Sequence, residues 1–236
     1  MSYYRQLIQN TIVPDLIAAY QLSNATDSYA GLNGTATNVV FNSVNAVNGN
    51  AGQFDSLVSA GIIIPDNNIF SFTNGTTDIP YSIKCNIFLR TINTLSAIFW
   101  KGDGTVSPTR EYYFYIDNTN RVRIIHCSKS GTGVKIDAFA TTALAINTPY
   151  NIVLTYNGNG SSSGFKIYVN GVSQPMGSAN VGTYTTMNNT SVTPSIGSNN
   201  NRVLNFRGTI DELYIFKKEL SQAEVTALQT NFYPNI

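Results

Sequence analysis

The sequence feature that most constrains the fold is a series of short runs in which apolar and polar residues alternate, separated by clusters of asparagine, glycine and serine. Alternation with a period of two is typical of β-strands, because successive side chains of a strand point to opposite faces. Asn170-Gly171, inside "IYVNGVSQ", predicts a two-residue hairpin, since both turn positions require a positive φ. The runs predict strands at 16–22, 60–65, 81–90, 96–101, 111–116, 121–127, 133–140, 150–156, 165–169, 191–197 and 203–216.

Many short strands joined by turns predict an all-β fold built as a two-sheet sandwich or a barrel. The chain has 236 residues, a length at which all-β sandwiches commonly form one domain. Hydrophobic residues make up 42% of the chain, which is enough to fill the space between two sheets. We find no internal repeat and no linker, so we expect one domain over 14–236 preceded by a short segment, residues 1–13.

Two segments depart from the strand pattern, one near each end of the chain. Residues 3–12, "YYRQLIQNTI", space their apolar side chains helically and are followed by Pro14, which ends a helix. A helix of about ten residues is too short to be stable alone, so we expect this N-terminal helical segment to dock on the domain or on a partner. Near the other end, Ser221 and Glu224 have the spacing of a capping box, which predicts a short C-terminal helix with Val225 on its apolar face.

The low proportion of charged residues narrows the class of partner. Charged residues make up 11% of the chain, and the net charge is +1, whereas soluble domains usually have about 25% charged residues. The surface must therefore be covered by Asn, Ser, Thr and Tyr, a composition frequent in extracellular and virion proteins. Nucleic-acid binding requires clustered Lys and Arg, and Arg121-Val-Arg123 is the nearest approach to a cluster. We expect no nucleic-acid partner, no signal peptide and no membrane span, since no stretch approaches ~20 apolar residues.

The two cysteines and the single histidine do not form a recognisable reactive or metal site. Cys85 and Cys127 fall on separate predicted strands, where we expect buried free thiols. A disulfide is the alternative, which would require an oxidising compartment and closely spaced Cα atoms. His126 is adjacent to Cys127, but a metal site needs three or four ligands and the chain has no second histidine. We therefore expect His126 to be an ordinary strand residue.

The end of the chain resembles a known family. In "GTIDELYIFKKELSQAEVTAL" (208–228), a glycine and an Ile-Asp-Glu strand ending in an aromatic residue precede a Leu-Ser-x-x-Glu helix. This order is similar to the closing signature of the laminin-G-type jelly rolls of the concanavalin A-like lectin/glucanase superfamily. The segment "PYNIVLTYNGNGSSSGFKIYVNGVSQ" (149–174) resembles a hairpin of the same family, and the similarity begins near residue 14. The resemblance implies a two-sheet antiparallel jelly-roll sandwich, but it implies no single function, because function depends on sites added to a fold.

The resemblance also implies a calcium ion, which in many relatives joins the first loop to the final strand. Asp211 matches the family's aspartate in Ile-Asp-Glu, and Asp27 and Asn33 fall in the matching first loop. Calcium takes six to eight oxygen ligands, which these side chains would provide together with backbone carbonyls. The alternative is that the carboxylates hydrogen-bond loop amides, and Ser23 stands where the first strand of many relatives ends in Leu-Asp.

Sugar binding requires one or two aromatic plates with hydrogen-bonding groups beside them, and the chain has candidates for both. Trp100 adjoins a glycine-containing loop, and Tyr113 and Tyr115 lie on one face of a predicted strand. Arg110 and Asn200 are candidate hydrogen-bonding residues. The alternative for each aromatic side chain is a structural place in the sandwich, because aromatic residues are common in strands.

The sequence predicts no catalytic residues. Glucanases of this fold carry the pattern Glu-x-Asp-x-x-Glu, which supplies the paired carboxyl groups of glycoside hydrolysis, and the pattern is absent here. One histidine flanked by apolar residues does not support a Ser-His-Asp or Cys-His set. We therefore expect a non-enzymatic protein.

Two functions fit these observations. Cellular relatives of this fold usually act outside the cell and carry signal peptides, and we expect none here. The leading hypothesis is therefore a virion structural protein, a capsid decoration or a head or tail fibre component. It would be made in the host cytoplasm, dock on other virion proteins through residues 1–13, display its jelly roll on the virion surface and bind host or mucosal glycans, with a homo-oligomer as one expected assembly. The alternative is a soluble or secreted carbohydrate-binding lectin module, which would be extracellular.

Overall fold

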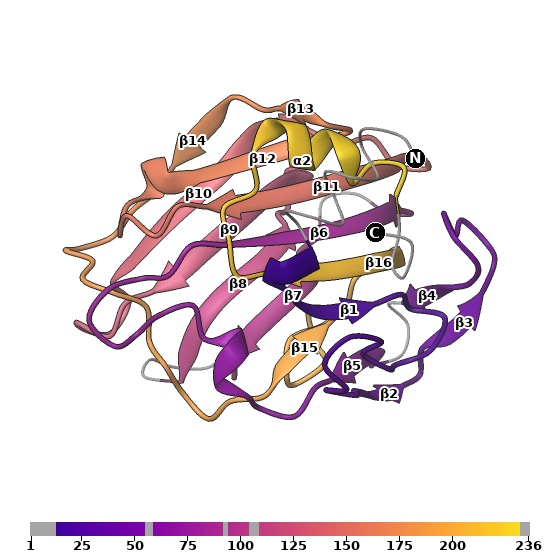
Figure 1. The fold of residues 1–236 in the computed structure, drawn as a ribbon, viewed down its shortest axis with the longest axis horizontal. Helices are drawn as coiled ribbons and strands as arrows, with labels where there is room; N and C mark the ends of the chain where they lie inside the picture. The colour runs from indigo at the N-terminus through magenta and orange to yellow at the C-terminus, as the bar shows by residue number, and fades with distance from the viewer. Residues whose placement is uncertain (1–12, 55–58, 92–93, 104–108, 232–236) are drawn as a thin grey trace.

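The computed structural model describes residues 13–54, 59–91, 94–103 and 109–231. Over these residues the chain forms two antiparallel sheets of eight strands each, packed face to face (Figure 1). The predicted all-β sandwich is confirmed. The predicted N-terminal helix lies outside the described residues, which begin with a 3-10 turn at Val13–Asp15.

The first sheet, sheet A, has the closing strand β16 (Gly208–Phe216) in its middle. The strand order is β13, β12, β11, β6, β16, β4, β3, and β1 pairs with the second half of β16. These strands are β1 (Leu16–Tyr20), β3 (Val40–Asn42), β4 (Ala51–Phe54), β6 (Tyr81–Leu89), β11 (Pro149–Tyr156), β12 (Phe165–Val169) and β13 (Val172–Ser173). The first strand of the chain, β1, therefore pairs with its last strand, β16.

The second sheet, sheet B, is dominated by four consecutive strands that lie side by side. Its order is β14, β10, β9, β8, β7, β15, β5, β2. These strands are β2 (Thr35–Thr37), β5 (Gly61–Ile63), β7 (Ser96–Gly102), β8 (Arg110–Ile116), β9 (Arg121–Cys127), β10 (Lys135–Ala143), β14 (Met176–Ser178) and β15 (Pro194–Ile196). Because β7 to β10 follow one another along the chain and across the sheet, they form one continuous face.

The core lies between the sheets and follows from the period-two pattern. Alternate residues of β6 and of β8 contribute to one buried hydrophobic cluster, among them Ile83, Ile87 and Phe114. The residues between them on β8, including Tyr113, point to the opposite side of sheet B and belong to a different cluster. Each sheet therefore has an inner face and an outer face with distinct compositions.

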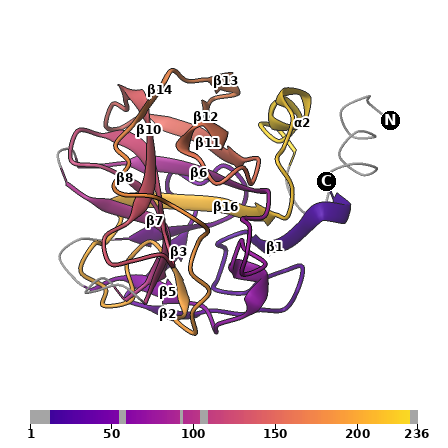
Figure 2. The same cartoon turned by 90° about the vertical axis from the view of Figure 1, so that its left-hand side faces the viewer.

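The helix α2 (Gln222–Ala227) covers the outer face of sheet A (Figure 2). The predicted capping box is confirmed, because the Ser221 and Glu224 side chains each accept a hydrogen bond from the other's backbone amide. Val225 and Leu228 are completely buried against Tyr214 and other apolar residues of sheet A. No helix within the described residues is long and apolar enough to cross a membrane.

The structure also corrects the predicted strands in several places. The predicted strand 16–22 ends at Tyr20, and Leu22 adopts a positive φ of 57°. The predicted strand 203–216 begins only at Gly208, and its pairing shifts between Asp211 and Tyr214, where Glu212 has a φ of 52°. Four strands of three or four residues were not predicted, because runs this short do not show a clear alternation: β2, β3, β4 and β14.

The hairpin and the cysteines match the sequence predictions. Asn170 and Gly171 have φ values of 49° and 75° and connect β12 to β13. Cys85 and Cys127 are buried free thiols, one in the core and one on the outer face of sheet B.

Candidate functional site

An aromatic cluster occupies the outer face of sheet B. Trp100 of β7 stacks on Tyr113 of β8, with ring centroids 3.7 Å apart and an interplanar angle of 18°. Tyr115 meets the Trp100 ring edge-on at 6.1 Å. The cross-strand register explains the stack, because Trp100 and Tyr113 are direct partners between β7 and β8. The predicted aromatic residues are thus brought together on one face.

A glycine at the end of β7 allows the rings to approach the strand backbone closely. A Cβ atom on Gly102 would lie 2.9 Å from the Tyr113 ring and 3.2 Å from the Cα atom of Arg110. The Gly102 carbonyl also accepts a 3.0 Å hydrogen bond from Trp100 Nε1. The indole is therefore fixed by a polar contact as well as by stacking, which preorganises the face.

Behind this end of β7 and β8, a buried ion pair sets the direction of Arg110. The pairing of the two strands shifts between Lys101 and Gly102, so that Glu111 turns inward to Lys101. The Lys101 ammonium also donates to Ser71 Oγ and to the carbonyl of Thr190, both at 3.0 Å. Burial raises the pKa of Glu111, and the Lys101 charge opposes that shift. The bulge leaves Arg110 beside the Tyr113 ring, with its guanidinium 6.0 Å from the ring centroid.

Two adjoining hollows open at this cluster and share Arg110 and Tyr113. The first has a volume of about 260 Å³ and the second about 310 Å³. The first is lined by Arg110, Tyr113, Ile125, Cys127, Gly133, Val134 and Lys135. The second is lined by Trp100, Arg110, Tyr113, Asn199, Val203 and Leu204. Aromatic walls with a few polar groups are the usual composition of a site for a small organic ligand.

Burial changes the pKa of two titratable groups on this face. Burial raises the pKa of the Cys127 thiol to about 11 and that of Tyr115 to about 12. Both groups therefore stay protonated and neutral. Arg123 and Lys135 both donate to the buried carboxylate of Asp137, at 2.8 Å and 2.7 Å. The face therefore offers aromatic surface, hydroxyl groups and cations, and the described residues that line the hollows include no carboxylate.

The five predicted sugar-binding residues differ in how the structure places them. Trp100, Tyr113 and Arg110 line the hollows, and Tyr115 packs beside them without lining either. Asn200 donates its side-chain amide to the carbonyl of Thr193 at 2.6 Å and does not line a hollow. Its role in binding stays a prediction.

Sequence reasoning missed several residues of this site. Asn199 lines the second hollow and accepts hydrogen bonds from the backbone amides of Val203 and Leu204, which shapes the loop beside Trp100. Ile125 and Cys127 of β9 line the first hollow. Their alternation with core residues of β9 was a usable signal, whereas the approach of Val134 and the Asn199 loop depends on pairings distant in sequence.

The residues predicted to bind calcium are placed in two separate hydrogen-bonded loops. The Asp27 carboxylate accepts four backbone amides at 2.9 to 3.2 Å, from Ala19, Tyr29, Ala30 and Leu32. Asn33 Oδ1 accepts the amide of Asp27 at 3.0 Å. Asp211 Oδ2 instead accepts the amides of Val47 and Asn48, at 2.7 Å and 3.3 Å. Amide donors direct positive charge at these oxygens, so the Asp27 loop does not fit a cation.

A buried lysine supplies positive charge near Asp211. Lys84 is fully buried, donates to the Glu212 carbonyl at 3.3 Å and lies 4.7 Å from the Tyr214 ring centroid. Burial lowers the pKa of Lys84 to about 8 and raises that of Asp211 to about 6. The described residues contain no cluster of three or more His, Cys, Asp or Glu side chains suited to a metal. Calcium binding stays a prediction, and the hydrogen-bonding alternative describes the observed contacts.

His126 belongs to a polar network inside the sandwich. Its Nε2 atom lies 2.7 Å from the Tyr81 hydroxyl, and its Nδ1 atom lies 3.7 Å from Asp78. Asp78 also accepts hydrogen bonds from the hydroxyl groups of Tyr156 and Tyr184, both at 2.8 Å. Burial lowers the pKa of His126. The predicted strand histidine is confirmed as a buried, neutral residue that organises the core.

Comparison with known families identifies the fold independently. The profile of the family described as the concanavalin A-like lectin/glucanases superfamily, Laminin_G_3, matches residues 58–226. Comparison with curated protein sequences gives no match.

Solved structures with similar folds come from proteins of several kinds. Domain 4 of AbnA, an extracellular GH43 arabinanase from Geobacillus stearothermophilus solved with arabinotriose, is 18% identical with a TM-score of 0.63, over 91% of this chain and 98% of that one. The binding domain of Paraclostridial Mosquitocidal Protein 1 is 14% identical with a TM-score of 0.69, over 92% of this chain and 52% of that one. Trypanosoma rangeli sialidase is 15% identical with a TM-score of 0.60, over 92% of this chain and 33% of that one. At these identities the similarity establishes the fold alone.

Proposed function

This chain belongs to the concanavalin A-like lectin/glucanase superfamily, and on that premise we propose that it is a glycan-binding domain whose binding site is the outer face of sheet B. The observation that carries the proposal is the stacked pair of Trp100 and Tyr113, of which Tyr113 lines both hollows and Trp100 lines the second. A pyranose ring presents an apolar face to an aromatic ring and hydroxyl groups to its sides. Aromatic side chains combine large contact area with specific geometry, and Arg110 provides hydrogen bonds next to them.

Two of the structural neighbours support this use of the fold. One is a domain solved with arabinotriose, and the other is described as a binding domain. Binding is also a better fit than catalysis to the site itself. Glycoside hydrolysis requires a pair of carboxyl groups across the scissile bond, whereas the described residues lining both hollows include none.

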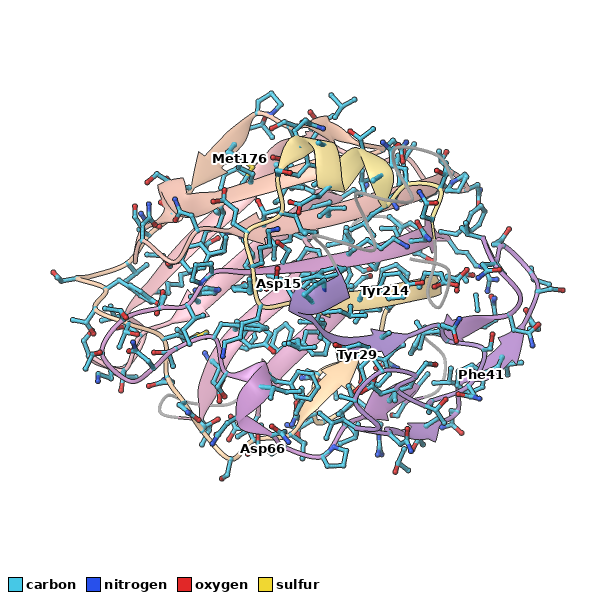
Figure 3. All side chains as sticks on the ribbon, viewed as in Figure 1. Asp15, Tyr29, Phe41, Asp66, Met176 and Tyr214 are labelled. Atoms are coloured by element: carbon cyan, nitrogen blue, oxygen red, sulfur yellow. The ribbon has the colours of Figure 1, made fainter. Side chains whose placement is uncertain are left out.

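A glycan array with calorimetry on the hits tests the proposal. Trp100→Ala should weaken binding about tenfold or more, because truncating a central aromatic residue of an interface commonly costs ~2 kcal/mol. The matched control is Tyr29→Ala, since Tyr29 is 42% exposed on a loop beside β1 of sheet A (Figure 3). Circular dichroism of both variants monitors folding. Equal glycan binding by the wild type and a folded Trp100→Ala variant would contradict the proposed site. Absence of binding to every glycan on the array would contradict the proposed function.

For the setting we propose the surface of a virus particle, with residues 1–13 docking on other virion proteins. The support is the uncharged polar coat, since charged residues make up only 11% of the chain. Co-sedimentation with purified particles tests this. Deletion of residues 1–13 should release the domain from particles and leave its glycan binding intact. Assembly of the shortened chain onto particles would refute the docking role and leave the lectin proposal standing.

A further inference from the structure

A fully buried lysine lies among four oxygen atoms near the end of β7. The Nζ atom of Lys101 is 2.5 Å from Glu111 Oε1 on β8 and 3.0 Å from Asp66 Oδ1. It also donates to Ser71 Oγ and to the Thr190 carbonyl, both at 3.0 Å. The side chains of Lys101 and Glu111 are completely buried, whereas that of Asp66 is 27% exposed. One amine and two carboxyl groups are therefore held together at the border of the core.

Aromatic side chains separate this group from water on its inner side. Tyr112 is the direct partner of Lys101 in the pairing of β7 with β8. Burial raises the pKa of Tyr112, and the charges of Glu111 and Asp66 add to that shift, which places both carboxyl groups near this ring. Phe99 lies 5.8 Å from Tyr112 between ring centroids, and both rings belong to the main core cluster. Exclusion of water protects reactive groups from side reactions such as hydrolysis.

The two carboxyl groups are held in different ways. Glu111 Oε1 also accepts hydrogen bonds from the amide and the hydroxyl group of Thr190, at 2.6 Å and 2.9 Å, which fix its position. Burial raises the pKa of Glu111, although the Lys101 charge opposes that shift, and a raised pKa favours the protonated acid. Asp66 lies just before the 3-10 turn Asn68–Phe70 (Figure 3), and its Oδ1 contacts Nζ directly. Glu111 is therefore placed to carry protons, and Asp66 presents its carboxyl carbon to the amine.

From this arrangement we propose that Lys101 Nζ and the Asp66 carboxyl group join in an intramolecular amide bond, with Glu111 as the proton carrier. The Nζ–Cγ bond forms and one Cγ–O bond breaks. Glu111 takes two protons from the ammonium group in turn and passes them to the departing oxygen, so that one water molecule leaves and Glu111 ends unchanged. The opposite charges of the ion pair cancel in the product, and no oxidant or reductant takes part. Well-oriented intramolecular reactions reach effective molarities of ~10⁵–10⁸ M, which favours the bond in the folded chain.

The bond would join two parts of the sandwich. Residues 64–80 connect β5 of sheet B to β6 of sheet A, and Asp66 lies on this connection. Lys101 lies on β7 of sheet B. The amide would therefore close a covalent ring that contains the crossover between the sheets, and a ring of this kind restricts the unfolded chain. It would serve stability and is independent of glycan binding.

Intact mass spectrometry of the denatured full chain tests the proposal, because an amide bond survives denaturation and an ion pair does not. The wild type should be lighter than its sequence mass by one water molecule. Trypsin should no longer cut after Lys101, and fragmentation of the branched peptide should place the bond between Lys101 and Asp66. A wild-type chain that keeps its full sequence mass after prolonged incubation in the folded state would overturn the proposal.

Variants assign the loss of water to these residues. Lys101→Arg, Asp66→Ala and Glu111→Gln should each show the full sequence mass, because they remove the amine, the carboxyl carbon and the proton carrier. The control is Lys166→Arg, the same substitution in the exposed ion pair with Glu219, which should retain the loss of water. Circular dichroism monitors folding. A loss of water that survives Lys101→Arg, or a bond that peptide mapping places at Glu111, would contradict the proposed cross-link.

Discussion

The outer faces of sheets A and B are both formed by antiparallel strands, but they differ in what covers them. On sheet A, α2 seals an apolar cluster that includes Tyr214, Val225 and Leu228, all completely buried. On sheet B, Trp100 and Tyr113 stack on each other and are each 6% exposed, and hollows open beside them. The first face is covered by the chain's own helix, and the second is the face on which we propose that a glycan binds.

The contrast extends to the polar groups of each face. The Tyr214 hydroxyl donates to Glu212 Oε2 on sheet A, whereas the Tyr113 hydroxyl on sheet B donates to the Cys127 sulfur, which is a weak acceptor. The hollows beside Trp100 and Tyr113 are the reason we propose a binding role for sheet B.

Truncation of an apolar side chain should give the largest difference in the free energy of unfolding between variants of the two faces. Leu228→Ala removes a fully buried side chain under α2 and should lower the free energy of unfolding by about 2–5 kcal/mol. Val203→Ala, at a residue 70% exposed beside the second hollow, should change it by less than ~0.5 kcal/mol. Urea unfolding measures both. Similar losses in the two variants would show that the faces do not differ in structural role.

Removing one hydroxyl group from each face should give a smaller difference in stability between the faces. Tyr214→Phe breaks a buried hydrogen bond to the Glu212 carboxyl group and should cost about 1 kcal/mol or more of unfolding free energy. Tyr113→Phe removes only a weak hydrogen bond to the Cys127 sulfur, so stability should change less than in Tyr214→Phe, while glycan affinity falls. Thermal unfolding and calorimetry of both variants measure the two effects. A loss of stability in Tyr113→Phe equal to that in Tyr214→Phe would indicate that the Tyr113 hydroxyl is structural.

Acid should destabilise the shared core more than either face. The folded protein keeps His126 neutral because burial lowers its pKa, whereas the unfolded chain binds a proton below about pH 6.5. Stability should therefore fall as the pH drops through that value, by at most ~1.4 kcal/mol per pH unit. Asp78, whose pKa is about 2 in the folded protein, adds a further loss between about pH 4 and pH 2. His126→Gln should flatten the slope between pH 6.5 and pH 5, and an unchanged slope would exclude His126 as its source.

Removal of calcium should change the stability and the glycan affinity least of all the treatments. The Asp27 oxygens are occupied by backbone amides, and Asp211 lies near the buried Lys84. We expect EDTA to shift the melting temperature by less than ~1 °C, with glycan affinity unchanged. Differential scanning calorimetry with and without calcium measures this. A shift of several degrees that Asp211→Asn abolishes would instead show that the calcium ion implied by the family resemblance binds at Asp211.

The fold could be predicted further than the site. The strand, turn and capping signals of 208–228 and the Asn170-Gly171 hairpin are local, so the sequence displays them directly. The short strands β2, β3 and β4 acquire their conformation from pairing with distant segments, such as β4 with β16. A run of three or four residues is too short to show that pairing in advance.

Only part of the site could be predicted from the sequence, because its other features also depend on the pairing of segments that are distant in the chain. Trp100, Tyr113 and Arg110 could be proposed because they are bulky or charged residues on or beside strands. The register that stacks Trp100 on Tyr113, and the inward turn of Glu111 that leaves Arg110 beside the ring, depend on the pairing of β7 with β8. The contribution of Asn199 comes from a loop that reaches this face only after the sandwich has folded.

Trp100 is the only tryptophan of the chain, so its fluorescence reports on the outer face of sheet B without labelling. The most direct measurement is acrylamide quenching of Trp100 during titration with a glycan that calorimetry shows to bind. If the glycan lies on this face, the emission should shift and the quenching constant should fall along the calorimetric isotherm. Saturating glycan that leaves both the emission and the quenching of Trp100 unchanged would place the binding site elsewhere and contradict the account.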